Sequence, residues 1–161
     1  MAVSGRRLRG VGSVKKNRLY IAYGSNMNLG QMKRRCPGAK VAGTAILENY
    51  RLLFRGGNGG SVATIEPYAG GSVPVLVWRI TPPDEAALDI YEGWPRLYRK
   101  EDINIRLDGK PASAMVYIMN EGRPLGQPGA FYYYTILEGY ETAGFDPSVL
   151  KKATEDSLET Q

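Results

Sequence analysis

The alternation of apolar and polar residues predicts a chain in which short strands outnumber helices. Apolar and branched residues recur continuously or at every second position in segments bounded by Gly, Pro, Asn or Asp, which is typical of strands. The predicted strands are 19–23, 40–47, 50–54 (partner or continuation of the segment before it), 62–65, 72–80, 98–107 and 112–119. Start and stop signals delimit predicted helices at 27–35, 81–92, 131–138 (aromatic enough to fit a strand as well) and 147–158. We therefore expect an α+β domain with a curved or closed sheet.

The first predicted strand runs into a loop of small polar residues, Gly24-Ser25-Asn26. Glycine permits a tight turn, and Ser and Asn side chains bond to nearby backbone. Successive N–H groups in such a loop can converge on one anionic or carbonyl group. An ordinary strand-to-turn corner is the alternative, and the loop alone does not decide between them.

Glycine residues mark other turns, loops and helix ends in the chain. Asp108-Gly109 predicts a hairpin between the strands on either side. The glycine-rich loop 55–61 lacks the following Gly-Lys-Ser/Thr of a nucleotide-phosphate loop. Gly139 is expected to end or interrupt the helix that begins near Phe131. We see no internal repeat and no second domain.

Composition narrows the possible chemistry. The 161 residues suit one domain, 43% hydrophobic and 23% charged. There is no histidine, which excludes Ser-His-Asp and Cys-His catalysis and histidine-based metal sites. The single cysteine, Cys36, excludes an intramolecular disulfide and suits a reducing, cytoplasmic setting. Acid–base work near neutral pH must then fall to a carboxylate, a tyrosine, a lysine or the substrate.

The net charge of +5 arises at one end of the chain. Residues 1–17 are rich in Gly, Arg, Ser and Lys, contain no acid and have little to bury, so we expect a disordered basic tail. Residues 18–158 form the predicted domain. A second basic run, Lys33 to Arg35, ends a predicted helix where cations complement the helix dipole, which we favour over a phosphate site.

Glu92 occupies an unusual position. It ends the predicted helix that starts at Thr81 and is followed by Gly93. The helix dipole is negative there, so the carboxylate is either solvated at small cost or held in place with a raised pKa. A general acid or base near pH 7 requires the second arrangement. Arg96 and Arg99 follow closely, and an arginine near Glu92 would lower its pKa unless it contacts substrate instead.

Several motifs, in order, resemble the γ-glutamylcyclotransferase-like family, which includes avirulence-induced-protein-like cyclotransferases. They lie between Leu19 and Phe145. They are Tyr23-Gly24-Ser25-Asn26, the segment 60–67, Leu88-Asp89-Ile90-Tyr91-Glu92-Gly93 with Tyr98, and the series Tyr132, Ile136, Gly139 and Gly144. The resemblance implies a small mixed β-barrel surrounded by a few short helices, with a cavity at one end.

The resemblance also implies a reaction. The α-amine of a γ-glutamyl group would attack its own γ-carbonyl, releasing 5-oxoproline and an amine or amino acid, with Glu92 as general acid and base. Backbone N–H groups of residues 23–26 would bind the α-carboxylate or the developing oxyanion. Tyr98 is assigned to substrate binding. Tyr132 would contribute a hydroxyl, although Tyr133 or Tyr134 would take that role if the register slipped by a residue. No metal or cofactor is implied.

Two other functions compete with this enzyme. A non-catalytic module binding small γ-glutamyl or carboxylate molecules would need no carboxylate with a raised pKa. A protein that binds nucleic acid through its basic tail is disfavoured, because residues 19–161 carry a net charge of −1. We expect a small-molecule substrate, no nucleic-acid or membrane partner, and a monomer or homodimer.

Overall fold

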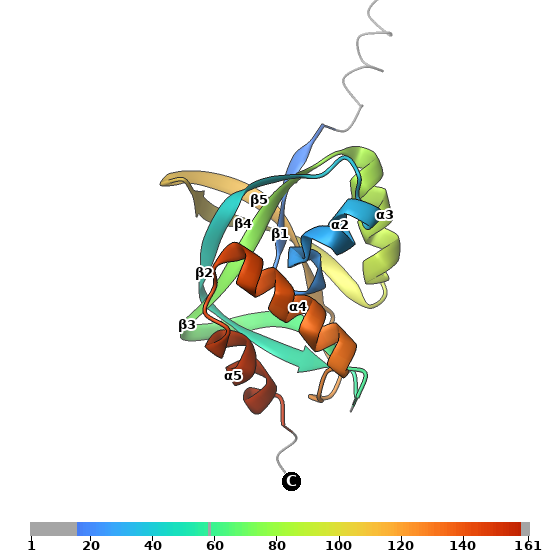
Figure 1. The fold of residues 1–161 in the computed structure, drawn as a ribbon, viewed down its shortest axis with the longest axis vertical. Coiled ribbons are helices and arrows are strands. Elements are labelled where there is room, and N and C mark those ends of the chain that lie inside the picture. The colour runs from blue at the N-terminus through green and yellow to red at the C-terminus, as the bar shows by residue number, and fades with distance from the viewer. Residues whose placement is uncertain (1–15, 58, 159–161) are drawn as a thin grey trace, which may run out of the picture.

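The computed structural model describes residues 16–57 and 59–158, which form a five-stranded sheet with helices packed around it (Figure 1). The strands are β1 (Arg18–Ala22), β2 (Lys40–Arg55), β3 (Val62–Ile80), β4 (Tyr98–Leu107) and β5 (Lys110–Met119). The helices are the 3₁₀ turn η1 (Ser25–Met27), α2 (Leu29–Arg35), α3 (Pro82–Glu92), α4 (Ala130–Ala143) and α5 (Ser148–Asp156). Of the predicted basic tail, residues 1–15 lie outside the described range, and Lys16 and Asn17 are exposed. None of the helices in the described ranges is long and apolar enough to span a membrane.

The strands form an open mixed sheet in the order β2-β3-β1-β5-β4. Short β1 lies at its centre, antiparallel to β3 and parallel to β5. The predicted α+β class is confirmed, but the predicted closed barrel is not. Within the described residues, β2 and β4 are the sheet edges and approach one another without a hydrogen-bonded ladder. Irregular pairing of β2 with β3 near Gly43 and near Asn49 redirects β2, as bulges do.

One predicted strand break is absent, and an open alternative is decided in favour of a continuous strand. Segments 40–47 and 50–54 are one strand, β2, and segments 62–65 and 72–80 are one strand, β3. Pro67 stays within β3 because β1 pairs only with residues 76–80, so Pro67 lies where β3 pairs with β2 alone. There the missing proline N–H can face away from the ladder. Tertiary pairing therefore overrode local turn signals.

The start and end of α3 follow the predicted signals. The Thr81 side chain accepts from the Asp84 N–H, and the Asp84 carboxylate accepts from the Thr81 N–H, which is a capping box. Gly93 ends the helix in the left-handed region with φ of 65°. These two signals position Glu92 as the last residue of α3. The Asp108-Gly109 hairpin between β4 and β5 is also confirmed.

Helix α4 corrects the expectation for Gly139. The helix continues through this residue and ends at Gly144, in the left-handed region. A Cβ atom at position 139 would lie 2.9 Å from the carbonyl carbon of Met27, so the absence of a side chain lets α4 pack directly on η1. The Asn28 side chain reinforces this contact by donating to the Thr135 carbonyl at 3.0 Å. Helix α4 thus supports the loop that follows β1.

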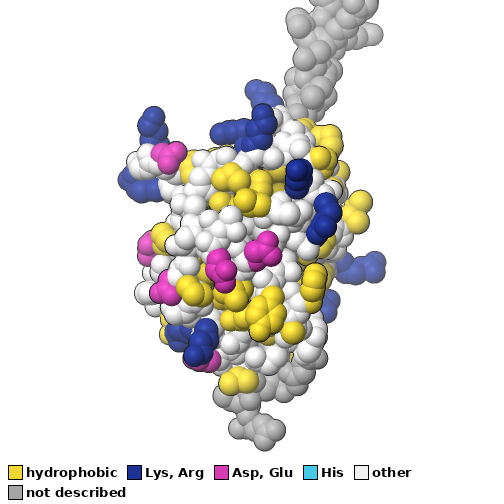
Figure 2. Space-filling model, viewed as in Figure 1, with side chains coloured by type: hydrophobic (Ala, Val, Ile, Leu, Met, Phe, Trp, Pro, Cys, Tyr) yellow, Lys and Arg dark blue, Asp and Glu magenta, His cyan; other side chains and the backbone are white. Residues whose placement is uncertain are grey.

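The outer surface of α4 carries both acidic and aromatic side chains. Acidic side chains gather over the middle of the face that α4 crosses, and Lys and Arg lie toward its margins (Figure 2). On this helix Glu138 and Glu141 are exposed, as are Phe131 and Tyr134. Positions 138 and 139 therefore face opposite environments, solvent and η1.

Gly139→Ala is expected to destabilise the protein by about 1–3 kcal/mol, because the added methyl overpacks the contact between α4 and η1. Intrinsic helix propensity alone would favour alanine over glycine. Urea denaturation measures the change, with Glu138→Ala on the exposed face as the control. A stabilised Gly139→Ala variant would mean that the two elements separate at no cost.

Candidate functional site

The loop after β1 is held from several sides. Residues 25–27 form η1, and the indole N–H of Trp78 on β3 donates to the Asn26 carbonyl at 2.9 Å. A Cβ atom at Gly24 would lie 3.2 Å from Ala63 Cβ and 3.5 Å from the Tyr132 hydroxyl, so glycine allows close approach of this backbone to β3 and α4. The small residues predicted to form a loop are therefore part of a rigid wall.

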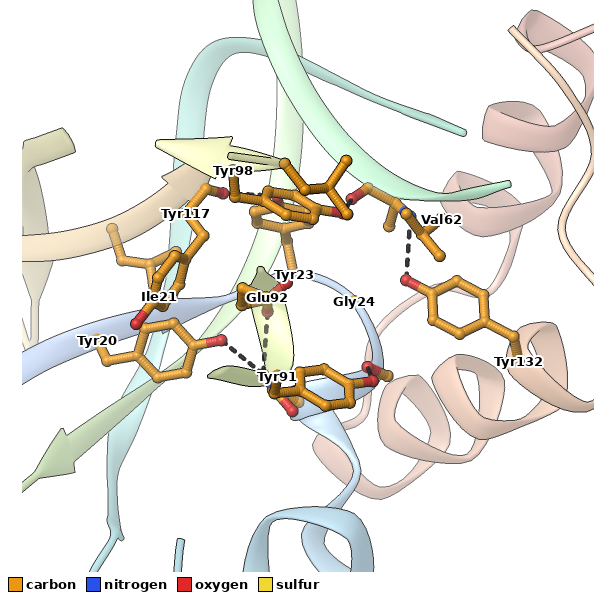
Figure 3. A pocket seen from close by; sticks show the side chains of 14 residues that line it. Tyr20, Ile21, Tyr23, Gly24, Val62, Tyr91, Glu92, Tyr98, Tyr117 and Tyr132 are labelled. Carbon is orange, nitrogen blue, oxygen red and sulfur yellow. Dashed lines mark hydrogen bonds between the residues drawn. The ribbon is translucent and has the colours of Figure 1, made fainter. Parts of the chain in front are cut away.

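A cavity of about 270 Å³ lies between this loop, β3, the end of α3, β4 and the start of α4 (Figure 3). All the predicted site residues border it: Tyr23, Gly24, Ser25, Asn26, Glu92, Tyr98 and Tyr132. The other residues of its wall are Tyr20, Ile21, Val62, Ala63, Tyr91, Leu97 and Tyr117. Of Tyr132, Tyr133 and Tyr134, only Tyr132 lines the cavity, and Tyr134 is exposed.

Glu92 is the one carboxylate on the cavity wall. Its Oε1 accepts from the Asn26 side-chain amide at 3.3 Å. Loss of hydration on burial raises the pKa of Glu92 to about 7, and the Arg35 guanidinium opposes part of that rise. Burial, rather than the helix dipole that the sequence suggested, is thus the main cause. The opposing cation is Arg35 and not one of the arginines that follow Glu92; Arg99 pairs with Glu101 at 2.6 Å.

Four tyrosines on the cavity wall remain neutral near pH 7. Burial is the largest cause of a raised pKa for Tyr20, Tyr23, Tyr98 and Tyr132, and the nearby Glu92 carboxylate adds to it. Glu92 is consequently the wall residue that changes protonation near neutral pH. The phenols act as hydrogen-bonding groups.

Hydrogen bonds within the protein use some of these hydroxyl protons. Tyr23 donates to the Tyr117 carbonyl and Tyr98 donates to the Ala63 carbonyl, each at 2.6 Å. These two side chains, both predicted to bind substrate, therefore direct their protons to the backbone. Tyr117 in turn donates to Asp89 at 2.6 Å, outside the cavity wall.

Other hydroxyls accept a bond from the protein and keep a proton. Tyr132 accepts from the Ala63 N–H at 3.0 Å, and Tyr20 accepts from the Asn26 side-chain amide at 2.9 Å. The hydroxyls of Ser25 and Tyr91 share one hydrogen bond at 2.8 Å, which leaves one proton between them. The cavity thus combines one carboxylate with several neutral donors.

Sequence reasoning missed Tyr20, Tyr91, Tyr117 and Arg35. Tyr20 and Tyr91 lie within the segments that carry the predicted site, so their proximity to Tyr23 and Glu92 was the available signal. Arg35 belongs to a run that we attributed to the helix dipole, and only the fold turns its side chain toward Asn26 and Tyr91. Among the described residues, no group of three or more Cys, Asp or Glu side chains is placed to hold a metal ion.

Comparison with known proteins identifies similar folds. A family model described as Gamma-glutamyl cyclotransferase, AIG2-like, matches residues 20–134, a span that contains the whole cavity wall. No curated protein matches the chain. A solved gamma-glutamyl cyclotransferase is 25% identical, with a TM-score of 0.74, and the match covers 91% of this chain and 90% of the other.

Two further structures are more distant in sequence. YkqA from Bacillus subtilis is 22% identical with a TM-score of 0.74, over 91% of this chain and 57% of its own. A yeast gamma-glutamyl cyclotransferase specific to glutathione is 11% identical with a TM-score of 0.61, over 88% and 97%. These two share the fold.

The raised pKa of Glu92 predicts a pH-dependent stability difference between wild type and Glu92→Gln. The folded carboxyl binds its proton more tightly than the unfolded one, so its contribution is complete below about pH 4.5 and is lost as pH rises through about 7. We expect Glu92→Gln to be more stable than wild type by about 1–3 kcal/mol at pH 8, and the difference to shrink toward pH 5. Denaturant unfolding at both pH values measures it. A difference independent of pH would place the carboxylate in water.

Proposed function

This chain belongs to the gamma-glutamyl cyclotransferase, AIG2-like family, and on that premise we propose that it converts a γ-glutamyl compound into 5-oxoproline and a free amine. The reaction needs no nucleophile from the protein, because the substrate's own α-amine attacks. The protein has to fold the glutamyl chain so that amine and γ-carbonyl meet, and to move protons. Neither task requires a histidine, which this chain lacks.

In the proposed reaction Glu92 carries one proton between two nitrogen atoms of the substrate. Ionised Glu92 takes one proton from the neutral form of the α-amine as the amine nitrogen forms a bond to the γ-carbonyl carbon. The carbonyl electrons move to oxygen, which gives a tetrahedral intermediate. When the carbonyl re-forms, the bond to the leaving nitrogen breaks, and Glu92 returns its proton to that nitrogen. The ring closes as a five-membered lactam.

The protonation behaviour of Glu92 suits both halves of this cycle. A pKa of about 7 leaves the carboxylate partly ionised near neutral pH, so it is available as a base. The same value makes its conjugate acid able to protonate a leaving amine. A carboxylate in water, with a pKa near 4, would be a weaker base by orders of magnitude.

The neutral donors suit the charges that form on the substrate. We assign the backbone of Gly24, Ser25 and Asn26 to the glutamyl α-carboxylate or to the developing oxyanion. Tyr132 and Tyr20 each accept one bond from the protein, so their protons are available to the same groups. Tyr23 and Tyr98 shape the wall, since their protons bind backbone carbonyls.

One observation carries the proposal. The partly buried Glu92 carboxylate borders the same cavity of about 270 Å³ as the Gly24–Asn26 loop. A module that only binds a carboxylate compound would gain from a cation on the cavity wall and would lose affinity from a buried acid. The acid therefore favours catalysis over simple binding.

Release of 5-oxoproline tests the proposal. The substrate panel is γ-glutamyl-alanine, γ-glutamyl-ε-lysine, a γ-glutamyl polyamine and glutathione. Wild type is expected to turn over at least one of them, with kcat/KM rising with pH through a midpoint near 7 as Glu92 ionises. Glu92→Gln should lower kcat by at least about 100-fold, because the amide keeps the shape and removes the base.

Glu141→Gln, an exposed residue on α4, is the matched control and should behave as wild type. Wild-type turnover that survives in Glu92→Gln would remove Glu92 from the mechanism. If wild type releases no 5-oxoproline but is stabilised in a thermal shift by glutamate or 5-oxoproline, the cavity is a binding site and the proposed reaction is wrong.

Tyr132→Phe and Tyr20→Phe should each lower kcat/KM by about 10- to 100-fold, because a hydrogen bond to a charged group contributes about 1.5–3 kcal/mol. Tyr134→Phe removes an exposed hydroxyl from the same helix as Tyr132 and should have no effect. Steady-state kinetics on the best substrate of the panel compare the three. Equal rates for Tyr132→Phe and Tyr134→Phe would exclude the Tyr132 hydroxyl from substrate binding.

A further inference from the structure

Arg35, the last residue of α2, joins the elements that carry the cavity. One end of its guanidinium group donates to the Asn26 side-chain oxygen, and Nη2 donates to Gln31 Oε1 at 2.8 Å. The flat face of the group stacks on Tyr91, with Cζ 3.5 Å from the ring centre. Tyr91 is the neighbour of Glu92, and its hydroxyl is bonded to Ser25. A single side chain thus contacts the loop, α2 and the end of α3.

The contact with Asn26 determines which way that amide points. A guanidinium group has donors and no acceptor, so it selects the amide oxygen of Asn26. The amide NH₂ is then directed to the Tyr20 hydroxyl at 2.9 Å and to Glu92 Oε1 at 3.3 Å. Rotating the amide by half a turn would set its oxygen against the Glu92 carboxylate. Arg35 therefore ensures that the Glu92 carboxylate accepts a hydrogen bond from the Asn26 amide NH₂ group.

Arg35 also provides the positive charge near this carboxylate. The titratable groups facing Glu92 are the phenols of Tyr20 and Tyr23 (β1), Tyr91 (α3), Tyr98 (β4), Tyr117 (β5) and Tyr132 (α4), and the Arg35 guanidinium (α2). Behind Tyr117, Lys100 pairs with both Asp89 and Glu85 at 2.7 Å, and Arg18 pairs with Glu85 at 3.3 Å, so the charges of this cluster largely cancel. Removal of Arg35 would leave Glu92 among neutral groups.

We propose that Arg35 is a positioning residue for Glu92: it orients the Asn26 amide toward the carboxylate, supports Tyr91 against Ser25, and places one positive charge beside the site. This inference rests on the proposed function in assigning Glu92 the role of base. The geometry itself does not depend on turnover. A test can therefore follow the Glu92 carboxyl group directly.

The experiment titrates the Glu92 side-chain carboxyl carbon by NMR in ¹³C-labelled protein, with the resonance assigned by its absence in Glu92→Gln. Arg35→Met keeps an unbranched apolar stem and removes the charge, the donors and the stacking plane. We expect the Glu92 midpoint to rise by about one pH unit in this variant. The midpoint of kcat/KM against pH should rise with it, and kcat/KM below pH 7 should fall.

Further variants distinguish the loss of the Arg35 charge from a loss of folding. Arg35→Lys keeps the charge and should retain the wild-type Glu92 midpoint. Activity should stay below wild type, because a lysine ammonium group cannot bond Asn26 and Gln31 in the same planar geometry or stack on Tyr91 as a guanidinium group does. Arg34→Met makes the same charge change at the exposed neighbouring position and should leave the Glu92 midpoint and the activity unchanged. If Arg35→Met does not fold, Arg35→Gln, which retains an N–H donor for Asn26, carries the same expectation of a raised midpoint.

The outcomes distinguish this inference from the proposed function. A raised Glu92 midpoint in Arg35→Met, restored in Arg35→Lys, supports the role of Arg35 even if wild type turns over none of the panel substrates. An unchanged midpoint in Arg35→Met or Arg35→Gln overturns it, whatever the loss of stability or activity, because Arg35 would then be a packing residue alone.

Discussion

Enclosing the Glu92 carboxylate costs free energy at neutral pH, because a charged group loses hydration that the protein replaces only in part. The replacement consists of one amide donor from Asn26 and one nearby cation, Arg35. Each of these depends on a separate element. The sheet carries the loop with Asn26, α2 ends at Arg35, and the capping box and Gly93 set the last residue of α3. The stability of the remaining core offsets this local cost.

The loop after β1 connects the Glu92 site to the core. Its backbone is anchored by Trp78 from β3, and α4 packs on η1 through Gly139, which has no side chain to hold the two apart. Both anchors come from segments distant in the chain. A rigid loop of this kind can present preorganised N–H groups, which cost no reorganisation when charge develops on a bound molecule.

A chain without histidine has few ways to move a proton near neutral pH, and burial of a carboxylate is one of them. The tyrosines complement it: burial keeps them neutral, so they donate hydrogen bonds without adding charge. In the proposed reaction both partners belong to one substrate molecule, so a small set of donors and one acid–base group is sufficient. The open sheet accommodates the cavity beside β1 rather than inside a closed barrel.

The sequence alone determined the features that depend on neighbouring residues: the strand and turn at Tyr23 to Asn26, the cap at Thr81, the end of α3 at Gly93 and the hairpin at Asp108. It also limited acid–base catalysis near neutral pH to a carboxylate, a tyrosine, a lysine or the substrate, since the chain has no histidine. Motif order led to the family and to seven residues that lie around one cavity.

Tertiary structure decided what depends on distant partners. Pairing of β2 with β3 on both sides of an irregularity at Asn49 kept each of them one strand, with Pro67 inside β3, and close packing on the Met27 backbone kept Gly139 inside a helix. The sheet stayed open, because barrel closure requires a ladder between β2 and β4, which local patterns do not specify. Burial and Arg35, rather than the helix dipole, set the pKa of Glu92, because desolvation and charge depend on the atoms that surround a group in space and not on its neighbours along the chain.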